Sequence, residues 1–384
     1  MRHDAEIDLA VGYPQFSNTK WLTTLWRDSS LAELAASFRD AHPEVPVNVT
    51  TGLPRHEDLT DQTLRAVCRF LGVDDELARY GCITYSGSHA LERAIATCLT
   101  GTVDANLVIT DPCIDIIPAM VEECNATPRC VRAPSLQEVP HVEDLIEAVD
   151  ERSAGLVVCS PENPTGAVYS EEAFVELSAS LDPRVPLIVD QSFLKIAPEQ
   201  PVPSFLGQPP ADRSWVFMWD TGKTLGMADG KLGFLFASPD MFPVIASRLE
   251  VLQYNLPAYS MLLADAALDA ASQHDYAQYL SERVRENGAE AMAMLDASSA
   301  RPLSPDAGGF LLVDVSRLGD DRTGAQLAAD LLAEERVGVV GGERFFHCGP
   351  PPVALWRIAL TRDRDVVREG MSRIVAFLER HAGG

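Results

Sequence analysis

The sequence predicts an α/β protein in which a mostly parallel central sheet is sandwiched by helices and followed by a smaller α+β C-terminal lobe. Two patterns predict this fold. Short apolar runs alternate with amphipathic helices across the middle of the chain, as in buried parallel sheets. A long helical stretch then leads to further strand-like segments. The length of 384 residues also favours two lobes, because one hydrophobic core rarely grows beyond about 250–300 residues.

Four apolar runs in the middle of the chain have the length and continuity of buried strands. They are Leu107–Thr110, Leu156–Cys159, Leu187–Asp190 and Trp215–Trp219. Three intervening segments repeat apolar residues three and four apart, which gives each predicted helix one buried stripe. They are Leu91–Leu99, Val142–Val149 and Glu171–Leu181.

The second half of the chain predicts a bridge between two lobes. A helical stretch runs from Met241 to Ala297 with interruptions near Asn255–Pro257 and Ser272–Asp275. The small lobe is then predicted from strands at Gly309–Val315, Val337–Val340 and Leu355–Leu360, and from a closing helix at Val366–Arg380. We therefore expect residues 1–45 to form an arm and part of the small lobe. Residues 46–270 are assigned to a large domain that carries the site, and residues 271–384 to a small C-terminal domain.

Composition excludes several classes of protein. Lys and Arg number 31 against 56 Asp and Glu, so the net charge of −25 disfavours nucleic acids and anionic membranes as partners. The sequence shows no membrane span, and Asp4, Glu6 and Asp8 do not fit a signal peptide, which predicts a cytoplasmic protein. The eight cysteines and eight histidines are scattered, so we expect no metal site and mostly buried, hydrophobic cysteines. The proline-rich segment Pro201–Pro210 predicts an exposed connection.

The first candidate site element is Ser86-Gly87-Ser88, between the strand-like Ile83–Tyr85 and a helix that starts near Ala90. Small residues at the start of a helix leave backbone N–H groups free to bind a phosphate. An ordinary serine cap with a turn glycine explains the same residues equally well.

The second element is the run Cys-Ser-Pro-Glu-Asn-Pro-Thr-Gly at 159–166, followed by the strand that ends at Asp190. A carboxylate at the end of a buried strand is costly unless a cation or strong donor faces it, and a pyridinium nitrogen is such a partner. Asp190 can instead cap the following turn, and Asn163 can be only a turn residue.

The third element is Lys223, within Trp219–Gly226 at the end of an apolar strand. A lysine among small residues there can be desolvated and can supply the amine that Schiff-base chemistry needs. The Gly-Lys-Thr triplet suggests a phosphate loop, but the glycine that this motif requires upstream is missing.

These elements, in this order, resemble the class I/II aminotransferases, the fold-type-I enzymes that use pyridoxal 5'-phosphate. The resemblance implies that Lys223 forms the internal aldimine, that Asp190 pairs with the pyridinium nitrogen and that Asn163 donates to the ring oxygen. It also implies a phosphate-binding turn at Ser86, Gly87 and Ser88, and further cofactor contacts from Ile114, Ser192, Thr221 and Lys231. Arg357 matches the arginine that binds the substrate α-carboxylate, although a buried structural arginine remains the alternative.

Four positions depart from the ordinary family pattern. Phe193 replaces a tyrosine that donates to the ring oxygen, and Lys231 replaces an arginine that binds the phosphate with a fork of donors. Ile114 stands where an aromatic ring usually stacks on the cofactor. Asp220 replaces the usual serine or threonine three residues before the lysine.

Several of these departures occur together in a narrower group that the chain resembles, the pyridoxal-phosphate-dependent arginine oxidases and hydroxylases of natural-product pathways. The shared motifs are Asp220–Lys223, Asp190–Phe193, Arg357–Leu360 and Phe346-His347. Gln15 is expected on the substrate side, in an N-terminal arm that covers the substrate in that group. Ile114 departs even from this pattern.

The main hypothesis is therefore an oxygen-using oxidase or hydroxylase of arginine-like amino acids, acting through an external aldimine and a quinonoid. The alternative is a conventional aminotransferase that passes the amino group to a 2-oxo acid, and an inert structural protein is a distant third. Asp220 either pairs with a distal cation of the substrate, or only holds its loop or keeps Lys223 charged. A homodimer is expected, because a second subunit usually completes fold-type-I active sites.

Overall fold

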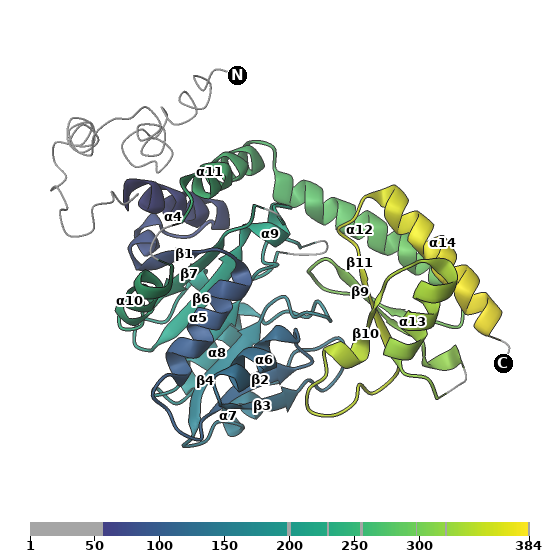
Figure 1. Cartoon of the computed structure of the whole chain (residues 1–384), viewed down its shortest axis with the longest axis horizontal. Coiled ribbons are helices and arrows are strands. Elements are labelled where there is room, and N and C mark those ends of the chain that lie inside the picture. Colours follow the sequence, from purple (N-terminus) through teal and green to yellow (C-terminus); the bar gives the residue numbers. More distant parts are fainter. Residues whose placement is uncertain are drawn as a thin grey trace, which may run out of the picture.

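The computed structural model describes residues 57–382, apart from 198–200, 229, 254–255, 297 and 319–320. The predicted arm at 1–45 and Gln15 lie outside the described residues. Within them the chain forms a seven-stranded sheet and a four-stranded sheet. Figure 1 shows the large sheet with its helices, the small sheet beside it, and helix α12 (Tyr276–Leu295) leading from the first to the second. Which domain each residue belongs to, with a boundary at 270, stays a prediction.

The large sheet confirms the predicted mostly parallel architecture. Its strand order is β1-β7-β6-β5-β4-β2-β3, and only β7 runs against its neighbours among the described strands. The strands are β1 Gly81–Thr84, β2 Asn106–Asp111, β3 Thr127–Arg132, β4 Ser153–Cys159, β5 Leu187–Asp190, β6 Trp215–Asp220 and β7 Gly233–Ala237. The four predicted apolar runs are thus β2, β4, β5 and β6.

Both faces of this sheet are covered by helices, as continuous apolar strands require. Successive side chains of a strand point to opposite faces, so Val108 joins one hydrophobic core while Leu107 and Ile109 join the other. The first core contains residues of α4 (Glu57–Leu71), α7 (Val142–Glu147), α8 (Glu171–Ser180) and α11 (Ala258–Gln273). The second contains residues of α5 (Gly87–Leu99), α6 (Ile116–Glu123) and α10 (Phe242–Gln253).

Some elements were not predicted, or were predicted with other bounds. The edge strand β3 is mostly half-exposed and carries two arginines, so it lacks a continuous apolar run. Helices α4 and α6 and strand β7 also have no counterpart in the prediction. The shorter elements are α9 Thr221–Thr224 and the 3₁₀ turns η1 Asp75–Tyr80, η2 Phe205–Gly207, η3 Ser316–Leu318 and η4 Gly342–Arg344.

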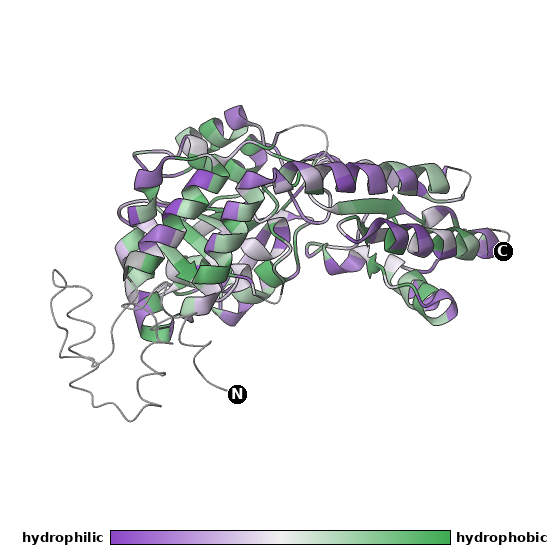
Figure 2. Cartoon of the chain, turned by 90° about the horizontal axis from the view of Figure 1, so that it is seen from above, coloured by the Kyte–Doolittle hydropathy of each residue, from purple (hydrophilic) through white to green (hydrophobic). Residues whose placement is uncertain are grey.

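The small lobe is an antiparallel sheet in the order β10-β11-β9-β8, packed against helices. Its elements are β8 Arg301–Leu303, β9 Phe310–Asp314, α13 Gly324–Glu335, β10 Val340–Gly341, β11 Leu355–Ala359 and α14 Arg364–His381. The predicted strand at Val337–Val340 is wrong except for its last residue, whereas the predicted helical stretch is α10, α11 and α12 with its breaks in the predicted places. Figure 2 shows an apolar strand of this lobe between helices whose outer faces are polar.

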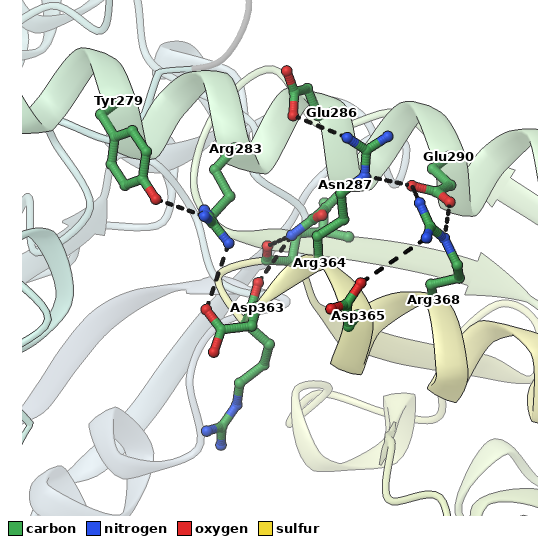
Figure 3. A network of polar contacts seen from close by, with 11 residues as sticks. Tyr279, Arg283, Glu286, Asn287, Glu290, Asp363, Arg364, Asp365 and Arg368 are labelled. Atoms are coloured by element: carbon green, nitrogen blue, oxygen red, sulfur yellow. Dashed lines mark hydrogen bonds and ion pairs between the residues drawn. The ribbon is translucent and has the colours of Figure 1, made fainter.

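Helices α12 and α14 are joined by a polar network that Figure 3 shows. On α12, Glu290 binds Arg364 and Arg368 of α14 at 3.0 and 2.6 Å. Buried Asn287 donates from Nδ2 to the backbone carbonyls of Leu360 (2.8 Å) and Arg362 (3.0 Å). The network therefore fixes the turn that follows β11, the strand that carries the predicted substrate arginine.

Two expectations about loops and cysteines need correction. Cys130 on β3 and Cys348 form a disulfide, and only Cys68, Cys113 and Cys159 of the other cysteines are fully buried. A sequence cannot show this pairing, because the two cysteines lie 218 residues apart. The segment predicted as an exposed connection contains buried Phe205 and Leu206. No helix among the described residues is long and apolar enough to cross a membrane.

Candidate active site

A pocket opens at the carboxyl ends of the parallel strands, where α/β sheets place their ligands. The predicted residues among its lining come from the segments after β1, β2, β4, β5 and β6. They are Gly87, Ser88, Ile114, Asn163, Asp190, Ser192, Asp220, Lys223 and Lys231. The predicted Ser86, Thr221 and Arg357 are not among the lining residues. Residues spread over 145 positions of the sequence thus meet in one place.

Asp190 ends β5 and lines the pocket, and one of its two carboxylate oxygens binds the turn that follows the strand. Its Oδ1 accepts hydrogen bonds from the backbone N–H (2.9 Å) and the hydroxyl (2.7 Å) of Ser192. No hydrogen bond to Oδ2 is found within the described part of the chain. Burial raises the pKa of Asp190 to about 6, against the hydrogen bonds from Ser192. Both sequence interpretations therefore describe part of the geometry: one oxygen caps the turn, and the other is available to a cation.

Asn163 lies between the pocket and Arg357. Arg357 on β11 donates from Nη1 to Asn163 Oδ1 at 2.7 Å, which leaves the Nδ2 group of the asparagine for a partner in the pocket. The loop that holds Asn163 turns at Gly166, whose φ of 76° is unfavourable for other residues. A side chain there would overlap the backbone carbonyl of Ala307 in the small lobe. The loop therefore connects the two sheets at the site.

Arg357 is enclosed by aromatic rings, and one of its donors has no partner. Its Cζ lies 5.1 Å from the ring centroid of Phe310 and 4.9 Å from that of Phe345. Its Nε is buried and has no hydrogen bond among the described residues. Burial lowers the pKa of Arg357, although a guanidinium stays charged under all ordinary conditions. A half-buried guanidinium with a buried, free donor is suited to an anionic ligand such as a carboxylate.

The turn before α5 uses its serine as a helix cap. Ser86 Oγ accepts a hydrogen bond from the His89 N–H at 3.1 Å, and the hydroxyl is therefore engaged with the helix. Gly87 and Ser88, which form the start of the first turn of α5, line the pocket. Of the three predicted phosphate-binding residues, the structure brings two to the pocket and gives Ser86 the capping role that was the alternative.

The segment after β6 forms the short helix α9 and carries Lys223. Asp220 caps this helix, with Oδ1 accepting from the Lys223 N–H at 2.9 Å. Thr221 is fully buried, and its hydroxyl accepts from the Leu232 N–H at 2.9 Å, so it holds the loop before β7. The expectation that Lys223 is desolvated is wrong for this chain, because its side chain is exposed and its Nζ has no hydrogen bond among the described residues.

Two hydrophobic positions shape the pocket. Ile114 and Phe193 both line it. The Phe193 ring packs edge-on against Phe310 of the small lobe, with centroids 4.7 Å apart. Phe193 therefore contributes contact between the lobes where the family's tyrosine would contribute a hydroxyl.

Glu162 is a buried acid beside the site that the sequence analysis did not select, although it lies inside the selected motif. Its Oε2 accepts from the Thr110 hydroxyl (2.7 Å), and its Oε1 accepts from the Asn163 N–H (3.0 Å). Burial raises the pKa of Glu162 to about 8. The acid thus ties the end of β2 to the residue that contacts Arg357.

The fold and this site define an α/β enzyme with a lysine and a strand-end aspartate in one pocket, and with an arginine bound to the pocket residue Asn163. The sequence model for aminotransferase class I and II matches residues 24–374, and the chain belongs to this family. Enzymes of the family use pyridoxal 5'-phosphate, so the chain is a pyridoxal-phosphate-dependent enzyme.

Known relatives and structures agree with this family. The chain is 25% identical to the putative aminotransferase YugH of Bacillus subtilis, over 97% of this chain and 92% of that protein. It is 26% identical to an aromatic amino acid aminotransferase of Mycolicibacterium vanbaalenii, but that match spans only 46% of this chain and 49% of the relative. The structure of Escherichia coli YbdL, described as having a methionine aminotransferase function, superposes with a TM-score of 0.72 at 19% identity, over 90% and 88% of the two chains.

The described residues fit the cofactor at three points. The free Oδ2 of Asp190 would hold a protonated ring nitrogen, the free Nδ2 of Asn163 would donate to the ring oxygen, and Lys223 Nζ would bind the aldehyde carbon. Asp220 fits less well, because it places a carboxylate beside the Gly87 turn where the phosphate would bind. Among the described residues no cluster of side chains is suited to hold a metal ion.

Proposed function

We propose that the chain catalyses transamination between a free L-amino acid and a 2-oxo acid. The observation that carries the proposal is the contact between Arg357 and Asn163, with a buried, unpartnered Nε beside it. An α-carboxylate bound by Arg357 would lie next to Asn163, the residue that would contact the cofactor ring. Relatives and neighbouring structures described as aminotransferases support the same reaction.

Each residue would have a separate task in this reaction. The bound cofactor supplies an electron sink for the substrate carbon atom. Arg357 binds the α-carboxylate and orients the amino acid, while Asp190 holds the ring nitrogen in its protonated form. Lys223 Nζ would act as the base that takes the proton from the substrate α-carbon. Its exposure in the single chain means that the substrate and a covering segment must exclude water from it.

We also propose a homodimer, because several large apolar side chains are exposed on α10, on α11 and just before α5. Val251 and Leu252 of α10 are 82% and 60% exposed, and Tyr259 and Leu263 of α11 are 61% and 52% exposed. Tyr85, directly before the phosphate turn, is 46% exposed. Large apolar side chains that would form one exposed patch are typical of a protein interface, and we propose that a second subunit covers these.

A second candidate function is the oxidation or hydroxylation of an arginine-like amino acid with dioxygen. Two positions of the pocket support it. Phe193 supplies no hydroxyl to the ring oxygen, and Asp220 supplies a carboxylate that matches a guanidinium. The run from Asp220 to Lys223 is also the one that the arginine oxidases and hydroxylases share.

The two functions differ in their electron acceptor, so oxygen uptake separates them. Purified enzyme loaded with pyridoxal phosphate is given each common amino acid, first without and then with a panel of 2-oxo acids. Transamination predicts no oxygen uptake, and amino-acid consumption only when a 2-oxo acid is present. Oxygen consumption with arginine alone would refute transamination in favour of oxidation. Lys223→Ala is the control, and a variant that stayed active would remove Lys223 from the mechanism.

A further inference from the structure

Asp220 lies between two helix N-termini that meet at the pocket. Its Oδ1 caps α9 by accepting from the Lys223 N–H at 2.9 Å. Its Oδ2 lies so close to the Gly87 backbone that a Cβ atom at position 87 would overlap it. The side chain is only 5% exposed, so this carboxylate is fixed at the first residue of α5 and cannot swing into solvent.

The first turn of α5 is also where the cofactor's phosphate would bind, since Gly87 and Ser88 line the pocket there. Helix N-termini attract anions through their free N–H groups. A phosphate arriving at this turn meets a carboxylate, whereas the family's usual serine or threonine would meet it with an uncharged hydroxyl. Two anions that share one site cannot both stay fully ionised, and the proton affinity of one of them rises.

The surroundings of Asp220 have opposing effects on the ionisation of its carboxyl group. Lys223 on α9 and Lys231 before β7 favour the carboxylate, as does the hydrogen bond from the Lys223 backbone. Burial has the largest effect and raises the pKa of Asp220, and Asp190 on β5 is a second acid whose charge is coupled to it. Both lysine side chains are exposed, so solvent screens them more than it screens the buried acid.

We propose that binding of the cofactor's phosphate is coupled to uptake of one proton, which Asp220 holds against the phosphate. The protonated carboxyl then donates to a phosphate oxygen while its other oxygen keeps the cap of α9. Affinity for the cofactor falls as the pH rises, because the proton becomes harder to supply. The inference rests on the proposed cofactor site and gives Asp220 a partner other than a substrate guanidinium.

Calorimetry of the aldehyde-free analogue 4'-deoxypyridoxine 5'-phosphate tests this coupling without Schiff-base formation. The apoenzyme is titrated at pH 8 in two buffers with different ionisation heats, and the difference in measured heat gives the number of protons taken up. Wild type is compared with Asp220→Asn and Asp220→Ser, because both replacements retain a good helix cap. Asp104→Asn is the control, since Asp104 is exposed and its left-handed backbone also suits asparagine.

The wild type and the control should take up close to one proton more than either Asp220 variant. The Asp220→Ser protein should bind the analogue at least tenfold more tightly than wild type at pH 8.5, and pyridoxine without the phosphate should show no such difference. Equal proton uptake in all four proteins would overturn the inference but leave the cofactor site intact. Failure of all four to bind the analogue would refute the proposed function itself. Weaker arginine binding by Asp220→Asn, with unchanged proton uptake, would assign Asp220 to a guanidinium instead.

Discussion

Replacement of Glu162 by glutamine should make the stability of the apoenzyme less dependent on pH. Glu162 is 2% exposed, and its carboxyl accepts from Thr110 and from the Asn163 backbone. Glutamine keeps the shape, and its amide oxygen can still accept from Asn163. The threonine hydroxyl can rotate to accept from the new amide nitrogen. The substitution therefore removes the titratable proton with little change in packing.

The magnitude follows from the pKa, which burial raises from 4.5 to about 8. Each pKa unit corresponds to about 1.4 kcal/mol, so ionisation of Glu162 costs the folded state up to about 5 kcal/mol. The folded state holds this proton more tightly than the unfolded chain. The stability that the proton contributes is therefore fully present below pH 4.5 and is lost as the pH rises to about 8.

Chemical unfolding of the apoenzyme from pH 5 to pH 9 measures the effect. The unfolding free energies of wild type and Glu162→Gln should be similar at pH 5, and the variant should become the more stable by about 2–4 kcal/mol at pH 9. Glu151→Gln, at an exposed turn position, controls for the loss of one negative charge. A stability difference between wild type and Glu162→Gln that does not change with pH would show that Glu162 is not protonated by burial.

Three further outcomes test the rest of the structure. Arg357→Lys should weaken substrate binding about 10- to 100-fold in spectral titrations, because an ammonium lacks the planar fork of donors that binds a carboxylate through two parallel hydrogen bonds while another donor holds Asn163; unchanged binding would exclude Arg357 as the receptor. Asn287→Ala should lower the unfolding free energy by about 1–3 kcal/mol, because the buried carbonyl of Leu360 and the partly buried carbonyl of Arg362 lose their donor, and a loss below about 0.5 kcal/mol would contradict this. Reduction of the Cys130–Cys348 disulfide should lower it by about 2–4 kcal/mol in wild type but not in Cys348→Ser. Equal sensitivity of both proteins to reductant would refute that assignment.

Most of the large sheet could be predicted from the sequence, because buried parallel strands must be apolar along their whole length. The runs at β2, β4, β5 and β6 carry that signal, and so do the breaks that separate α10, α11 and α12. Edge strand β3 carries no such signal, since only some of its residues are buried. The local pattern thus revealed four strands that are buried on both faces, but it missed edge strand β3 and also the fully buried β7.

For the candidate site, the sequence indicated which residues come together but not which atoms they bind. Lys223, Asp190 and Asn163 follow predicted strands, and the carboxyl ends of parallel strands meet at one edge of a sheet, so the sequence alone placed them near each other. The sequence could not show which atoms already have partners. Only the structure decides that the Ser86 hydroxyl caps α5, as one of the two sequence interpretations had it, and that the Thr221 hydroxyl binds the Leu232 N–H.

Long-range contacts decided the remaining features. The disulfide joins residues 218 positions apart, and Arg357 reaches Asn163 across 194 positions. Asp220 was expected from its sequence to face the substrate or to hold its loop, and the structure places its second oxygen against Gly87. The sequence determined which strands form and where their polar ends lie, because periodicity and apolar content are local properties. The partners of each polar atom depend on packing between distant segments, and only the folded chain brings these segments together.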